Sequence, residues 1–445
     1  PEAWYGEPLI QLGKHEEIKK LIGVTGKRAC FRDFFHEDGS YKLQAVVQAA
    51  SEKDDADKGM FEKTLMKVDE RVNIFSMLSS GWLLRIVPVE NDPNNTWVGE
   101  AMRGQTADRR ASRFFAAYRA ALSEAIGTGD YTTANGLLTE LDAFQRRAGV
   151  NVLPSDTQRA MEIKLNEWRV FKRLAWVYTL LGLAFLTFLF SGVIRGRDAS
   201  ARAKAVMVGL VAAAFVFHTV GLGLRWYVSE RAPWSNGYES MIYIAWTTVL
   251  AGLMFVRRSV GAMAATMVQS GVILLIALLS YLNPEITPLV PVLNSYWLTI
   301  HVSLEAGSYG FLMLGAIIGF VNLALMAITS QRRHARIKSL VREMTWLSEL
   351  TLTGGLFMLS VGTYLGGVWA NESWGRYWGW DAKETWALVS ILVYAFILHM
   401  RLIPKLAGTL AFNIANLVGL ASIIMTYYGV NFYLSGLHSY AAGDP

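Results

Sequence analysis

Long apolar blocks separated by short polar segments make up the chain from residue 174 onward. Each block is long enough to cross the roughly 30 Å hydrocarbon core of a bilayer at about 1.5 Å per helical residue. The blocks run over 174–194, 205–225, 238–256, 261–281, 297–328, 349–369, 385–403 and 407–430. This pattern predicts about eight transmembrane helices.

The residues before these blocks have a different pattern, in which charged and apolar positions are mixed as in a soluble protein. In segment 59–78 apolar residues recur every three or four positions, which is typical of a helix with one buried face. Similar spacing predicts further helices, with a short strand at 82–89. We therefore expect a mostly helical soluble module over 1–172 and an all-α polytopic membrane module over 173–445.

Basic residues fall mainly on one side of the predicted spans, and positive loops face the cytoplasm. That side carries Arg195, Arg197, Arg202, Lys204, Arg257, Arg258, Arg332, Arg333, Arg336, Lys338, Arg342, Arg401 and Lys405. The other side carries Arg225, Arg231, Arg376 and Lys383. An even number of spans then places the soluble module and the C-terminus outside the cytoplasm.

Composition agrees with this topology and excludes several classes of function. The chain is 53% hydrophobic and 18% charged, unlike an ordinary soluble protein. Its net charge of +6 is explained by the basic loops, so no nucleic-acid partner is expected. Cys30 is the sole cysteine, which excludes an intrachain disulfide, a CxxC pair and a thiolate cluster. The start at Pro1 suggests a piece of a longer product.

Three histidines of the membrane module are candidate ligands, because ionisable groups in spans are costly. His301 lies near the outer end of its span, and His438 follows the last span at the same outer level. Either alone is more often an interfacial hydrogen-bonding residue, but a pair beside an aromatic loop favours ligation. His399 lies roughly 20 Å deep, towards the cytoplasm. His218 lies at a different depth, so we expect a partner for His399 outside this chain and a packing role for His218.

The segment 374–386, WGRYWGWDAKETW, contains four of the 15 tryptophans of the chain. An interfacial aromatic belt is the ordinary explanation, but a belt spreads over many helix ends. The flat rings of Trp374, Tyr377, Trp378 and Trp380 could instead hold a planar ligand. Its carboxylates could pair with two cations of the same segment, Arg376 and Lys383. Asp381 belongs to the same candidate site and is expected to orient the loop by capping the following helix. Haem meets these requirements, since its iron accepts histidine.

This segment resembles the tryptophan-rich WWD motif of haem-handling proteins. The stretches 221–241, 296–310 and 427–441 are similar to the CcsA-type subunit of the System II cytochrome c synthase, which is often fused to CcsB as CcsBA. The resemblance covers about 174–441, with four motifs in the same order. It makes 369–386 the expected outer haem-binding loop.

The resemblance implies export of haem b across the bacterial inner membrane and its covalent attachment, as ferrous haem, to the CxxCH cysteines of apocytochrome c in the periplasm. In this family His301 and His438 match the ligands of external haem iron, and His399 matches a ligand of haem in transit. The second ligand of that transit site belongs to the CcsB-type part. A thioredoxin-like partner is implied as the thiol reductant.

Two other functions remain open at this stage. The first is a haem exporter or delivery protein of the WWD superfamily without synthase activity. The second is a structural membrane subunit with an aromatic belt.

Overall fold

The structure is a computed structural model that describes residues 2–12, 16–53, 58–100, 110–196, 200–256, 259–279, 282–287, 295–331 and 334–434. The chain forms two compact units, Pro1–Pro154 and Ser155–Pro445. This boundary lies before the predicted division at 172/173. Helix α7 (Asp156–Trp168) belongs to the second unit because it packs against α9 (Ala201–Ser229). In this contact Gln158 Nε2 donates to the carbonyl of Val228 at 2.9 Å.

The first unit is mostly helical, as predicted. Its helices are α1 (Glu2–Tyr5), α2 (Glu16–Ile22), η1 (Phe31–Phe34), α3 (Gln44–Ser51), α4 (Met60–Ser79), α5 (Arg110–Thr128) and α6 (Thr132–Ala148). Two antiparallel pairs of two-residue strands accompany them, β1 (Ile10–Gln11) with β2 (Arg28–Ala29) and β3 (Val87–Pro88) with β4 (Trp97–Val98). Helix α4 buries the predicted stripe residues Leu65, Val68, Val72 and Phe75 in the core of this unit.

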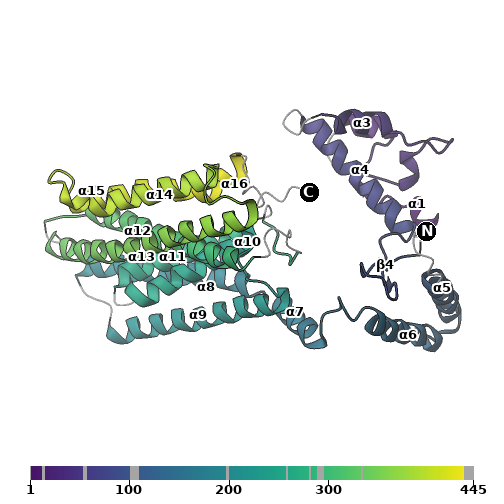
Figure 1. Cartoon of the computed structure of the whole chain (residues 1–445), viewed down its shortest axis with the longest axis horizontal. Helices are drawn as coiled ribbons and strands as arrows, with labels where there is room; N and C mark the ends of the chain where they lie inside the picture. The colour runs from purple at the N-terminus through teal and green to yellow at the C-terminus, as the bar shows by residue number, and fades with distance from the viewer. Residues whose placement is uncertain are drawn as a thin grey trace. The chain divides into compact units, whose positions relative to one another are not determined.

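The second unit is a bundle of long helices (Figure 1). Besides α7 and α9, its helices are α8 (Val170–Arg195), α10 (Gly237–Ala251), η2 (Gly252–Val256), α11 (Val260–Ala277), α12 (Tyr296–Ala327), α13 (His334–Trp374), α14 (Ala382–His399), η4 (Met400–Leu402), α15 (Thr409–Ile424), η5 (Met425–Gly429) and α16 (Val430–Tyr433). Helices α12 and α13 pack together along their lengths. The fold is all-α and polytopic, as the sequence predicts.

Seven helices of the described residues are long and apolar enough to cross a membrane, where the sequence predicts about eight. The difference is the predicted span 238–256. There the 15-residue α-helix α10 continues directly as the five-residue π-helix η2. Helix α13 differs in the other direction: its 41 residues include the basic segment from His334 that the sequence assigns to a loop.

Candidate functional site: a cavity beside the tryptophan loop

The second unit contains a cavity of about 450 Å³, within the usual range for small-molecule sites. Its wall combines the end of α9, the loop that follows it, the starts of α10 and α14, the first half of α12, the end of α13 and the segments η5 and α16. Several of these segments come from far apart in the sequence. The cavity therefore exists only once the helices of the bundle have packed.

His301 lies on the cavity wall, on the second turn of α12. Its Nδ1 lies 2.7 Å from the Gly362 carbonyl oxygen of α13. Because a carbonyl can only accept, Nδ1 carries a proton, and in the neutral ring Nε2 is then the acceptor nitrogen. Metal-binding histidines show this arrangement, in which the second ring nitrogen donates to a backbone carbonyl or a carboxylate. The His301 ring therefore has the tautomer of an axial ligand.

The orientation of this ring is fixed by close packing against α13. The indole of Trp369 lies almost parallel to the imidazole, with ring centroids 6.4 Å apart and an interplanar angle of 12°. A Cβ at Gly366 would lie 2.6 Å from His301 Cε1, closer than any real Cβ contact. Glycine at this position is therefore required for the imidazole to lie against the helix.

The aromatic loop contributes two of its predicted residues directly to the cavity wall, Tyr377 and Trp378. The Trp378 Nε1 atom is buried and has no hydrogen-bond partner among the described residues. Trp374 packs edge-to-face on Trp369 at 4.8 Å, and Trp380 on Trp378 at 5.7 Å, so each contacts a residue that lines the cavity. This loop thus gives the cavity wall two aromatic side chains, one of which has a buried N–H group without a partner among the described residues.

A second aromatic group lines the cavity from the end of α9 and the loop that follows it. Trp226 and Trp234 line it, with ring centroids 5.3 Å apart. Trp234 Nε1 donates to the Thr299 carbonyl at 3.1 Å, which ties this loop to α12. Neither tryptophan was predicted as a site residue, although both lie in the stretch 221–241 that carries the family resemblance.

Buried polar groups line the inner part of the cavity. The Glu305 carboxylate, 8% exposed, accepts hydrogen bonds from Thr363 Oγ1 at 2.7 Å and from the Tyr309 hydroxyl at 3.3 Å. Lys383 also lines the cavity, and its Nζ donates to Asn431 Oδ1 at 2.8 Å. A carboxylate and an ammonium group therefore share the same apolar enclosure.

Asp381 caps α14, as predicted, rather than lining the cavity. Its Oδ1 accepts the backbone N–H groups of Lys383 at 3.0 Å and Glu384 at 2.9 Å. In return, the Glu384 carboxylate accepts a hydrogen bond from the Asp381 backbone N–H, which completes a capping box. The guanidinium carbon of Arg376 lies 6.0 Å from the Trp374 ring centroid, and Arg376 is not among the residues that line the cavity.

The remaining histidines lie elsewhere. His399 is exposed at the end of α14, where its Nδ1 donates to the Ala395 carbonyl at 2.7 Å. His218 is fully buried between helices, and its Nδ1 lies 3.2 Å from the Tyr178 hydroxyl, as expected for a packing residue. His438 lies outside the described residues. Among the residues that the structure covers, no cluster of three or more His, Cys, Asp or Glu side chains could hold a metal ion.

Several cavity residues were not predicted as site residues. They are Arg231, Ser240, Glu305, Tyr309, Thr363, Tyr427 and Asn431. Glu305 could have been found, because it lies one turn after His301 on the same helix face. Arg231 and Tyr427 lie within stretches that carry the family resemblance. Thr363 sits in an apolar span with no local signal, so only packing identifies it.

Comparisons with known proteins place this site in a family. The model of the cytochrome C assembly protein family matches residues 234–438, which include every described element of the cavity wall except the end of α9 and residues 230–232. The chain is 37% identical over 295 residues to the cytochrome c biogenesis protein CcsA of Synechococcus sp. (strain CC9605), covering 59% of this chain and 96% of that protein. It is 38% identical over 262 residues to CcsA of Synechococcus sp. (strain CC9902), covering 52% and 85% respectively.

Protein NrfI of Wolinella succinogenes is similar over the whole chain. The two are 41% identical over 446 residues, covering 100% of this chain and 49% of NrfI, so the chain spans about half the length of that relative. Together with the seven helices of the described residues that are long and apolar enough to cross a membrane, these similarities show that the chain is a multi-pass membrane protein of the CcsA-type cytochrome c assembly family.

Proposed function

We propose that the chain is the CcsA-type part of a cytochrome c synthase, which carries haem b across the bacterial inner membrane and attaches it to apocytochrome c. The observation that supports this most is that His301, with a ring proton on Nδ1, and Lys383 line the same aromatic cavity. An imidazole of this tautomer is a suitable ligand for haem iron.

In this proposal His301 and His438 are the two axial ligands of external haem. The rings of Tyr377 and Trp378 contact the macrocycle, while Trp380 packs on Trp378 and Trp374 packs on Trp369. The chain positions ferrous haem so that two cysteine thiols add across its two vinyl groups. Each addition forms a carbon–sulfur bond while the thiol proton goes to the other vinyl carbon, so no oxidant is needed. Orientation is the main contribution of the protein.

His399 is proposed to bind haem on its way across the membrane. Its ring is exposed at the end of α14, so a second ligand from a CcsB-type part could reach the same iron. This arrangement leaves the inner haem site incomplete without that part. The soluble unit and the C-terminus are proposed to lie in the periplasm, where a thioredoxin-like protein would keep the substrate thiols reduced.

Coexpression of the full-length protein with a CxxCH acceptor tests this function. Covalent haem on the acceptor, detected by haem staining after denaturing electrophoresis, is the expected result. A protein that purifies with haem but leaves the acceptor unmodified would instead be an exporter or delivery protein. A matched acceptor with AxxAH distinguishes thioether formation from tight noncovalent binding.

A further inference from the structure

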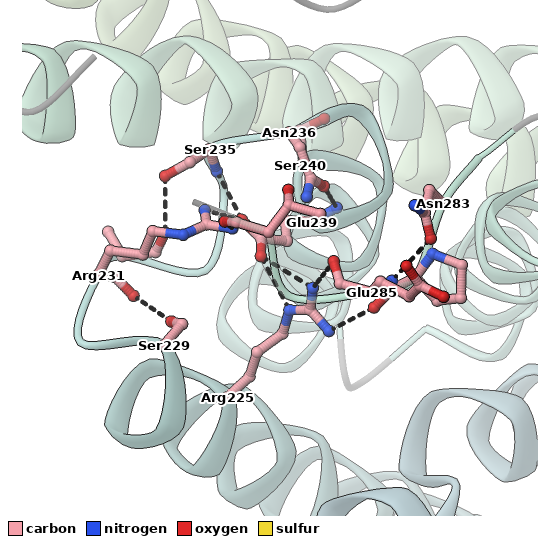
Figure 2. A network of polar contacts seen from close by, with 12 residues as sticks. Arg225, Ser229, Arg231, Ser235, Asn236, Glu239, Ser240, Asn283 and Glu285 are labelled. Atoms are coloured by element: carbon pink, nitrogen blue, oxygen red, sulfur yellow. Dashed lines mark hydrogen bonds and ion pairs between the residues drawn. The ribbon is translucent and has the colours of Figure 1, made fainter. Parts of the chain in front are cut away.

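Three charged side chains meet beside the cavity at the junction of α9, the following loop and α10 (Figure 2). The Nε atom of Arg225 donates a hydrogen bond to Glu239 Oε1 at 2.9 Å. The terminal Nη2 atom of Arg225 also lies 2.9 Å from Glu239 Oε1. Arg231 donates to Glu239 Oε2 at 2.8 Å. One carboxylate is therefore shared by two guanidinium groups.

The cluster has more positive than negative charge in a place where water is largely excluded. The side chains of Arg225 and Glu239 are 5% and 0% exposed, and that of Arg231 is 13% exposed. Two cations against one anion leave an excess charge of one, and a buried unbalanced charge is costly. Glu230 lies on the cavity wall nearby, but its exposed side chain is screened by water. An anion bound at the cluster would offset this excess.

Arg231 is the member of the cluster that lines the cavity. Besides Glu239, its guanidinium donates to the Thr287 carbonyl at 3.2 Å. A guanidinium has five N–H groups, so these two hydrogen bonds leave donors for a ligand. Arg225, by contrast, is tied to the carbonyls of Pro284 and Glu285 at 2.9 and 3.3 Å and does not line the cavity.

We propose that Arg231 binds a carboxylate of the cavity ligand. For haem this carboxylate is a propionate, so the inference rests on the proposed function and deepens it. Guanidinium groups are well suited to this contact because they bind carboxylates through paired, charge-assisted hydrogen bonds. Arg231 thus takes the role that the sequence analysis gave to Arg376, while Lys383 supplies a second cation from α14.

Glu239 is a positioning residue for this contact. Glu239 Oε2 also accepts a hydrogen bond from the Ser235 backbone N–H at 3.0 Å. The backbone N–H of Glu239 donates to Asn236 Oδ1 at 2.8 Å. The carboxylate is therefore fixed at the start of α10, and it fixes Arg231 in turn. A guanidinium that is oriented before binding loses less side-chain freedom when the ligand arrives.

The test compares ferrous haem with haem dimethyl ester, in which both propionates are blocked. Each is titrated by absorption into the full-length protein in one detergent, using the wild type, Arg231→Gln, Arg231→Lys and Arg376→Gln. Arg159→Gln, an exposed ion-paired arginine of α7, controls for loss of a positive charge. Comparing the two ligands within each variant removes differences in detergent partitioning.

We expect the wild type to prefer the free acid over the ester by roughly tenfold or more. Arg231→Gln should lose most of this preference while binding the ester as the wild type does, which also shows that the variant is folded. Arg231→Lys should keep part of it, and the Arg159 variant all of it.

Other outcomes would overturn the inference. Equal binding of acid and ester by the wild type would do so, as would an unchanged preference in Arg231→Gln. A loss of preference in Arg376→Gln alone would assign the carboxylate to the tryptophan loop. Failure of the wild type to bind either compound would reject the proposed function itself, which separates the two failures.

Discussion

At the scale of single residues, the imidazole of His301 is held by three neighbours. The Gly362 carbonyl fixes its tautomer, Trp369 lies flat beside it, and the absence of a side chain at Gly366 gives it room. The sequence predicted this histidine from its place in a span. The neighbours come from α13, about 60 residues later, so the fixed tautomer could not be predicted.

Trp378 allows a prediction about ligand binding, because its buried Nε1–H has no partner among the described residues. An unmet buried donor costs roughly 1–3 kcal/mol, and a ligand acceptor would remove that cost. Trp378→Phe should therefore weaken haem binding by roughly three- to tenfold and leave the ligand-free protein at least as stable. Haem titration and thermal unfolding check both expectations.

Trp346→Phe is the matched control, since Trp346 is 62% exposed and does not line the cavity. Its haem affinity should equal that of the wild type. If Trp378→Phe also binds haem with unchanged affinity, the indole N–H does not contact the ligand.

At the scale of elements, the start of α14 joins the tryptophan loop to the bundle. The capping box of Asp381 and Glu384 satisfies the first N–H groups of the helix, and Glu384 also accepts the Gly379 N–H at 2.7 Å. The sequence predicted this cap from an acidic residue at the helix start. It did not predict that the cap would also hold the loop.

The capping role predicts different effects for two substitutions of Asp381. Asp381→Ala should lower stability by about 1 kcal/mol, whereas Asp381→Asn should cost little because asparagine caps well. Thermal unfolding in detergent measures both. Haem loading and attachment should be unchanged in Asp381→Asn, and their loss without a change in stability would show a chemical role for the carboxylate.

Helix α15 has its polar residues inside and its apolar residues outside. Asn413, Asn416, Ser422 and the following Thr426 are buried, whereas Leu410, Ile414, Val418 and Ile424 are exposed. Polar side chains in a membrane bundle face its interior, where they can be hydrogen-bonded. The sequence predicted the span but not which face was buried, because mean hydropathy does not separate the two faces.

The buried amide of Asn413 should stabilise the bundle. It accepts from Asn322 Nδ2 at 2.9 Å and donates to Thr345 Oγ1 at 3.0 Å, linking α15 to α12 and α13. Interhelical hydrogen bonds in membranes contribute about 0.6 kcal/mol each on average. Asn413→Leu should therefore cost about 1–2 kcal/mol in detergent unfolding. Val418→Ala, at an exposed position of the same helix, should change stability by less than about 0.5 kcal/mol, and equal stabilities for the two variants would contradict this view.

At the scale of the whole molecule, hydrophobic patterning predicted the helical soluble part and nearly all spans. It did not predict local changes of helix geometry, such as the π-helix η2 after α10, since periodicity does not register one altered turn. It also began α13 too late, because a basic segment outside the apolar core can remain helical.

The candidate site was predicted only in part, for a similar reason. Residues concentrated in one motif, such as Tyr377 and Trp378, were identified from the sequence. Residues brought in singly by other helices, such as Thr363 from α13 and Arg231 from the loop after α9, became visible only in the packed bundle. A cavity built from separate helices has no single signature in the sequence.

The central claim is that this cavity binds haem through His301. The most direct measurement is the absorption spectrum, oxidised and reduced, of the purified full-length protein and of His301→Gly and His438→Gly, each with and without imidazole. The account predicts low-spin haem in the wild type, its loss in each variant, and its recovery when imidazole replaces the missing ring. A wild type without haem, or a His301→Gly variant with an unchanged spectrum, would contradict the claim.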